Sequence, residues 1–306
     1  MRSGGTADDG GEDEPRRLHQ AAPVEQPRWS LSLVRGMSTV GRSPRLLGTA
    51  LIGALVLWLL STVPGPVHFA SPGVLAQIES LAPVHTLLDI QFLATADRVV
   101  PPIAVGALGV AILLVRAVLT VFVLGFATSV LTTEGTDRDH ARMALARLPA
   151  ALVAIAGLEI AFAIAVEVST IVLEQIFGAA GALLALVLVT YFLIYAPVVA
   201  VAEPTSVADA VKLATRAPRV PGRSHVLFAL VYPFASLLLA SRSGTAIDAT
   251  PSILVWAYAL LVTFVHVSVL VALAYRWLRI RAPVVEGTLP PPRWRIAPAD
   301  RGPGRS

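Results

Sequence analysis

Six stretches of the chain consist almost entirely of apolar residues, and polar or charged segments separate them. A helix needs about 20 apolar residues to cross the hydrocarbon layer of a membrane, with roughly 17 to 25 as the usual range. The pattern therefore predicts an all-α, polytopic membrane helix bundle with six transmembrane helices. The six runs cover residues 46–63, 102–131, 149–173, 179–202, 224–240 and 252–275.

Composition supports a membrane location. Of the 306 residues, 55% are hydrophobic and 14% are charged, whereas soluble domains carry roughly 25% charged residues. The net charge of +4 does not indicate nucleic-acid binding, because the arginines flank apolar runs and do not form a basic face on a soluble domain. The chain has no cysteine, which excludes disulfides, thiolate metal sites and cysteine nucleophiles.

Arginine and lysine residues near the ends of the spans predict the orientation, because they are enriched on the cytoplasmic side of membrane proteins. Sixteen lie on the side that holds both termini, and two lie on the other side. We therefore expect a multi-pass protein of the cytoplasmic (plasma) membrane with both termini in the cytoplasm. The sixteen are Arg28, Arg35, Arg42, Arg45, Arg138, Arg142, Arg147, Lys212, Arg216, Arg219, Arg223, Arg276, Arg279, Arg281, Arg293 and Arg295, and the two are Arg98 and Arg242.

Polar segments at both ends flank the six-span membrane domain, which we assign to residues 29–281. Residues 1–28 have almost no large apolar side chain, so they are predicted to be a disordered cytoplasmic tail. Residues 282–306 contain three consecutive prolines and are predicted to be a flexible tail. The first long apolar run begins only at Leu46, which argues against a cleaved signal peptide. Residues 64–100 are predicted to form an interfacial helical loop on the outer side.

Two short amphipathic helices are predicted on the cytoplasmic side, at residues 139–149 and 206–217. In the second, Ser206 is the expected N-cap, with Asp209 completing a capping box, and Pro218 ends the helix. Its apolar face comprises Val207, Ala210, Val211 and Ala214, while Asp209, Lys212 and Arg216 share the opposite face. A cytoplasmic basic face, expected to attract anionic lipid by about 1 kcal/mol per charge, comprises Lys212, Arg216, Arg219 and Arg223.

Three ionisable residues fall near the middle of predicted spans: Arg116, Glu159 and His266. Charged groups at that depth are costly and are candidates for function. Arg116 and Glu159 have matching depth on neighbouring antiparallel helices, so we predict that they pair. A pair that only fixes helix register is favoured over a transport or proton site. His266 is expected to form a hydrogen bond between helices, and Tyr191 and Tyr195 are expected to pack or hydrogen-bond.

The sequence contains no HExxH, GxSxG, Walker-type or GxGxxG motif. Hydrolytic, nucleotide-driven and dinucleotide chemistries therefore have no positive support. The two tails are also too short to hold a catalytic domain. We expect a protein that is not an enzyme and that has no cofactor and no metal site.

The stretch at residues 190–223, TYFLIYAPVVAVAEPTSVADAVKLATRAPRVPGR, carries a family resemblance. It resembles uncharacterised integral membrane proteins related to the membrane domain of glycerophosphoryl diester phosphodiesterases. The resemblance extends loosely over residues 45–280. It implies a membrane architecture and no catalytic residue, because the catalytic domain of those relatives is absent. The matching residues are Tyr195, Ala196, Pro197, Glu203, Ala210, Val211 and Arg216.

Two functional interpretations follow from different classes. The first is a non-enzymatic membrane module that acts on lipid or on a protein partner at its basic cytoplasmic face. The second is a small transporter or channel subunit with a polar site around Arg116, Glu159 and His266. Six helices are few for a carrier, so the second interpretation favours a homo-oligomer. A polar, water-accessible cavity that reaches these residues would support transport, and a tightly packed ion pair would support the module.

Overall fold

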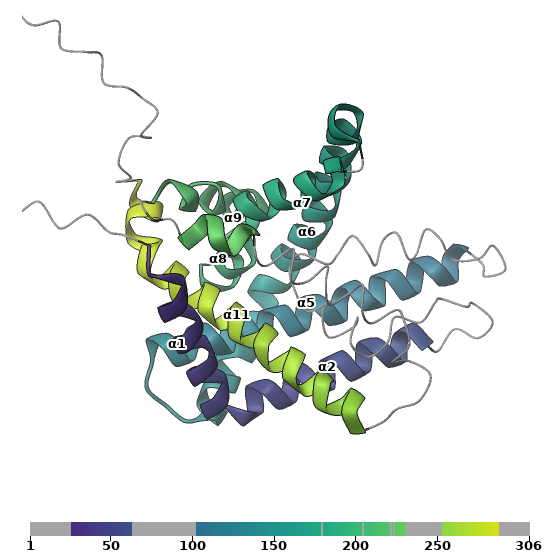
Figure 1. Cartoon of the computed structure of the whole chain (residues 1–306). Coiled ribbons are helices and arrows are strands. Elements are labelled where there is room, and N and C mark those ends of the chain that lie inside the picture. Colours follow the sequence, from purple (N-terminus) through teal and green to yellow (C-terminus); the bar gives the residue numbers. More distant parts are fainter. Residues whose placement is uncertain are drawn as a thin grey trace, which may run out of the picture.

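The chain is helical throughout the part that can be described, and no strand occurs among those residues. The computed structural model describes residues 26–62, 102–178, 180–203, 205–220, 222, 224–230 and 253–287. The predicted all-α fold is confirmed (Figure 1). The labelled helices are α1 (Trp29–Arg42), α2 (Pro44–Thr62), α5 (Pro102–Thr132), α6 (Asp137–Phe177), α7 (Ala180–Leu193), α8 (Ala196–Ala202), α9 (Val207–Ala214), the 3₁₀ turn η1 (Ala217–Arg219) and α11 (Ile253–Glu286).

α5 and α6 form a hairpin joined by a short turn at residues 133–136. The side chain of Thr136 accepts a hydrogen bond from the backbone N–H of Asp139, whose carboxylate accepts one from the backbone N–H of Thr136. This capping box satisfies free donors at the start of α6. Further along, a β-carbon at Gly125 would lie 3.1 Å from the Cα of Ala144. Small residues therefore let the two helices approach closely.

The prediction of a separate short helix at residues 139–149 is wrong, because these residues belong to α6. α6 runs without interruption from Asp137 to Phe177 and contains Pro149. Proline lacks an N–H and disfavours a helix interior. Here Ala144 and Ala151, on either side of Pro149, are both buried in the same apolar core. Packing on both sides of the proline outweighs its local preference, because most helix stability in proteins comes from tertiary contacts.

The fourth predicted span is interrupted. α7 ends at Leu193 and α8 begins at Ala196, with a turn at Ile194 and Tyr195 between them. Pro197 explains the interruption, since it cannot donate to the carbonyl of Leu193 and its ring would clash with that carbonyl in a continuous helix. The two helical pieces therefore enclose a turn that holds the side chain of Tyr195 in the protein core.

The N-cap predicted for α9 is confirmed. The Ser206 hydroxyl accepts a hydrogen bond from the backbone N–H of Asp209 at 3.2 Å. The Asp209 carboxylate accepts a hydrogen bond from the Ser206 hydroxyl at 2.7 Å. In a capping box it would accept from the backbone N–H of Ser206 instead. Ala210 and Ala214 are buried, and Lys212 is exposed.

α1 was not predicted as a helix, because residues 29–42 have no long apolar run. It packs along α11 (Figure 1), with Ser32, Gly36, Thr39 and Val40 buried. A β-carbon at Gly36 would overlap the backbone carbonyl of Ser268 in α11. Glycine is thus required at this crossing, where the two backbones meet without an intervening side chain.

Four helical stretches among the described residues are long and apolar enough to cross a membrane, which indicates a membrane protein. The first predicted span coincides with most of α2. Of the fifth, residues 224–230 are helical and residues 231–240 lie outside the described part, as does the outer loop at 64–100. The four stretches are Leu113–Thr132, Asp137–Phe177, Leu183–Ala202 and Thr263–Glu286.

Both predicted tail boundaries shift. α11 continues to Glu286, with Pro283 inside it, so the flexible tail does not begin at Ala282. Val284 in this extension is fully buried, which explains why the helix persists. At the other end, Gln26 falls in the predicted disordered tail, yet its side chain is buried and hydrogen-bonded to the backbone carbonyl of Ala217.

The crossing of α1 and α11 predicts opposite effects for two glycines of the same helix. Gly36→Ala should destabilise the protein by about 1 to 3 kcal/mol, because the added methyl overpacks a backbone contact. Gly41→Ala should stabilise it by about 0.5 to 1 kcal/mol, since open space surrounds Gly41 and alanine favours the helix. Thermal unfolding in mild detergent measures both. Equal effects of the two substitutions would contradict the close crossing.

Candidate functional site

Arg116 on α5 and Glu159 on α6 form a buried ion pair, as predicted from their matching depth. The Nε atom of Arg116 lies 3.9 Å from Oε2 of Glu159, and the side chains are 4% and 9% exposed. This distance exceeds that of a direct hydrogen bond, so these two atoms attract each other as charges. The pair links α5 to α6 inside the protein.

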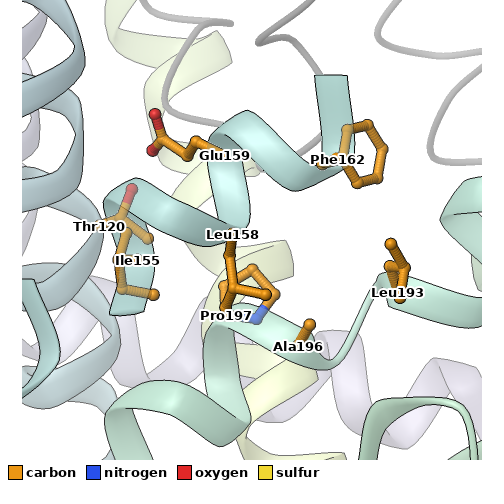
Figure 2. Close-up of a pocket in the computed structure, with 8 residues that line it drawn as sticks. All are labelled: Thr120, Ile155, Leu158, Glu159, Phe162, Leu193, Ala196 and Pro197. Atoms are coloured by element: carbon orange, nitrogen blue, oxygen red, sulfur yellow. The ribbon is translucent and has the colours of Figure 1, made fainter. Parts of the chain in front are cut away.

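A small cavity lies next to Glu159. Its volume is about 20 Å³, which is room for about one water molecule. Figure 2 shows Leu158 on α6 beside Pro197 at the start of α8, while the carboxylate of Glu159 points away from Ala196 and Pro197. Thr120 and Glu159 supply the polar side chains of the lining, and the rest is apolar. The eight lining residues are Thr120, Ile155, Leu158, Glu159, Phe162, Leu193, Ala196 and Pro197.

The interruption between α7 and α8 opens onto this cavity. Leu193, the last residue of α7, lines it together with Pro197, the residue that causes the interruption. The carbonyl of Leu193 cannot receive the usual helical hydrogen bond, because Pro197 has no N–H. Glu159 and a broken helix therefore border the same small space.

A second polar centre was not expected from the sequence. Arg276 had been counted among the cytoplasmic charges, but its side chain is completely buried. Its Nε donates to the Tyr195 hydroxyl at 2.9 Å, Nη1 to the backbone carbonyl of Pro27 at 2.7 Å, and Nη2 to Oε1 of Gln26 at 2.6 Å. The guanidinium also lies 4.8 Å from the centre of the Phe228 ring, a cation–π contact. We call Gln26, Pro27, Tyr195, Phe228 and Arg276 the Arg276 cluster.

The Arg276 cluster reaches the segment after α9. Nε2 of Gln26 donates to the backbone carbonyls of Ala217 and Val220, at 3.1 and 3.3 Å. Tyr195 in the cluster hydrogen-bonds and packs, as expected. Its ring stacks on that of His225, whose Nε2 lies 2.6 Å from the backbone carbonyl oxygen of Tyr191.

The other predicted site residues are His266 and the residues of the basic face. His266 is buried on α11, a helix that packs against α5. Lys212 and Arg219 are exposed, Arg216 is half-buried, and Arg223 lies outside the described residues. Among the described residues, no group of three or more histidine, cysteine or acidic side chains is arranged to hold a metal ion.

Two further arginines, Arg281 and Arg147, make contacts between helices. Arg281 on α11 forms an ion pair with Glu203, the residue after α8, with Nε 3.0 Å from Oε1. Arg147 on α6 donates to the Thr128 hydroxyl of α5 and to the backbone carbonyl of Val201 on α8, the latter at 3.4 Å. Arg147 thus links α6 to α5 and α8, and Arg281 links α11 to the end of α8.

The chain matches no protein-family model, no curated protein and no solved structure. The resemblance of residues 190–223 to the membrane domain of glycerophosphoryl diester phosphodiesterases therefore stays a prediction. Further conclusions about function rest on the geometry of this chain alone.

The Arg276 cluster predicts a stability cost for loss of a single hydroxyl. Tyr195→Phe should reduce the free energy of unfolding by about 1 to 3 kcal/mol, because it leaves a donor of a buried, charged guanidinium without its acceptor. Tyr191→Phe, one turn earlier and outside the cluster, should have a smaller effect. Thermal unfolding of both variants in the same detergent makes the comparison. A loss at Tyr191 that equals the loss at Tyr195 would argue against the cluster.

Proposed function

We propose that this protein is a six-span module of the cytoplasmic membrane that has no catalytic activity and acts on lipid or on a protein partner. Its termini and basic loops lie on the cytoplasmic side. The excess of arginine and lysine on that side, sixteen against two, supports this orientation. The working surface is the basic face formed by Lys212, Arg216, Arg219 and Arg223.

One observation carries this proposal: Arg116 and Glu159 are buried within ion-pair distance of each other, and the cavity beside Glu159 has room for about one water molecule. Charged residues of a transport pathway face a water-filled cavity. Here Arg116 and Glu159 are each within reach of the opposite charge, and the small cavity beside Glu159 has a mostly apolar lining. Their arrangement favours a structural role, which leaves the cytoplasmic surface as the place of action.

A small transporter or channel subunit is the second candidate, and one observation favours it. Interrupted transmembrane helices border substrate sites in many transporters, and the break between α7 and α8 borders the same cavity as Glu159. In this interpretation the cavity widens in another conformation or in a homo-oligomer, and Glu159 carries a proton or faces an ion.

Replacement of the ion pair by apolar residues tests its structural role. Arg116→Met alone or Glu159→Leu alone should cost about 3 to 5 kcal/mol, because each leaves one charge buried without its partner. The double variant should regain most of this loss, since no charge is then buried there. Unfolding in detergent measures the three free energies. Losses that add in the double variant would show that the two residues do not act as a pair.

Flux across liposomes separates the two candidates. The purified protein is reconstituted into sealed liposomes that contain a pH-sensitive dye, and an imposed pH gradient is followed with the wild type, the double variant and empty liposomes. The module interpretation expects the same slow decay in all three. Faster decay with the wild type, abolished by Glu159→Gln in protein that remains folded, would establish the transporter interpretation instead.

A further inference from the structure

α1 has an unusual distribution of exposed side chains. One side of the helix packs on α11 through Ser32, Gly36, Thr39 and Val40. The rest of its circumference divides into an apolar part and a strongly basic part. No acidic residue occurs in the helix sequence WSLSLVRGMSTVGR.

The apolar part consists of three large side chains on one side of the helix. Leu31, Val34 and Met37 are 55%, 62% and 47% exposed and lie within about 120° of one another around the helix. Single exposed apolar residues are common on protein surfaces, but several on one side of a short helix mark a contact with a partner or with lipid. We call these three side chains the apolar flank of α1.

The basic part is a stripe of arginines. Arg28, Arg35 and Arg42 are seven residues apart, so they shift by only about 20° per step around the helix and form one line along it. All three are exposed, and none has an ion-pair partner among the described residues. We call them the arginine stripe. Positive charge is therefore concentrated beside the apolar flank.

The position of α1 indicates what meets these two surfaces. α2, the first predicted span, begins at Pro44, directly after Ser43. Figure 1 shows α1 crossing the end of the bundle at which α2 begins. A helix with large apolar side chains on one flank and arginines on the next is suited to the boundary between lipid headgroups and acyl chains.

We propose that α1 is an interfacial anionic-lipid site. The apolar flank lies among the upper acyl chains of the cytoplasmic leaflet, and the arginine stripe binds lipid phosphate groups. This inference rests on the membrane location and orientation of the proposed function, and it adds a specific helix and ligand class to it. Because guanidinium groups bind phosphate oxygens through paired N–H donors, acidic phospholipids are the matching chemistry.

The depth of α1 can be measured directly, because the chain contains no cysteine that would react in the background. Val34→Cys is labelled with an environment-sensitive fluorophore and studied in nanodiscs of phosphatidylcholine and phosphatidylglycerol. Lipids with a quencher at a shallow acyl position should quench this label, and aqueous iodide should not. Glu134→Cys, exposed in the turn between α5 and α6, is the control and should show the reverse.

Two other results of the depth measurement would overturn the proposal. A label at position 34 that iodide quenches would place the apolar flank in water. A label that neither quencher reaches would show that a protein surface, such as a second copy of the chain, covers the flank. Thermal unfolding of the labelled variants confirms that the fold is intact, which is expected because the Val34 side chain is exposed.

The arginine stripe is tested by the association of spin-labelled phosphatidylglycerol relative to spin-labelled phosphatidylcholine. The triple variant Arg28→Gln, Arg35→Gln, Arg42→Gln should lose preference for phosphatidylglycerol, by up to about fivefold per arginine. The matched Arg→Lys triple variant keeps the positive charge and should retain most of the preference. Unchanged preference in the glutamine variant would overturn the lipid site.

Failure of this inference is distinguishable from failure of the proposed function. A variant with Lys212, Arg216 and Arg219 changed to glutamine tests the basic face of the proposal. If that variant loses the preference while the α1 variant keeps it, the α1 site is wrong and the proposed function stands. If the wild type shows no preference for phosphatidylglycerol at all, action on anionic lipid is wrong at both places.

Discussion

The buried guanidinium of Arg276 joins parts of the chain that lie far apart in the sequence. Its donors reach Pro27 and Gln26, which are 249 and 250 residues away, and Tyr195 in the interruption between α7 and α8. A guanidinium keeps its charge when buried, so every donor removed from water needs an acceptor in the protein. The start of the described chain, the break in the fourth predicted span and α11 must therefore come together in one arrangement. Gln26 extends this arrangement to the segment after α9.

Arg116 is also a buried guanidinium, but it has a different kind of partner. Where Arg276 is held by neutral acceptors and the face of Phe228, Arg116 has the opposite charge of Glu159 nearby. In both cases the arginine interacts with polar groups inside the protein and is not exposed at its surface. Lys212, Arg219 and the arginine stripe of α1 remain available on the surface. This division between charges that hold the bundle together and charges at its edge is the basis of our proposal for a module that acts at the membrane surface.

Some of these features were predictable from the sequence because they depend on local spacing or depth. The pairing of Arg116 with Glu159 follows from equal distances to the ends of neighbouring helices, and the N-cap at Ser206 follows from local chemistry. The Arg276 cluster depends on contacts between distant segments, for which a single sequence gives no direct signal. One local signal was available: Val269, Ala272, Leu273 and Ile280 share a helix face with Arg276. That face is apolar, which indicates burial of the arginine between them.

The errors in helix boundaries have a common physical origin. Prolines 149, 197 and 283 carry the same local preference against a helix interior. α6 and α11 continue through Pro149 and Pro283, whereas the helix breaks before Pro197. Buried contacts on both sides, such as Ala144 and Ala151 around Pro149, stabilise the continuous helices. α1 was not predicted because its buried face consists mostly of small and polar residues that fit against α11. Such a face does not produce the repeating apolar pattern by which a helix is recognised in a sequence.

The central claim is that the intramembrane polar residues are packed inside the bundle and are not part of a water-filled pathway. Thr120 lines the cavity beside Glu159, and cysteine is close to threonine in size. The most direct test is therefore the reaction of Thr120→Cys with a charged, membrane-impermeant thiol reagent, added to either side of reconstituted membranes. We expect no reaction from either side, while Lys212→Cys on the exposed surface reacts readily. Reaction at position 120 at a rate comparable to that at position 212 would contradict the account.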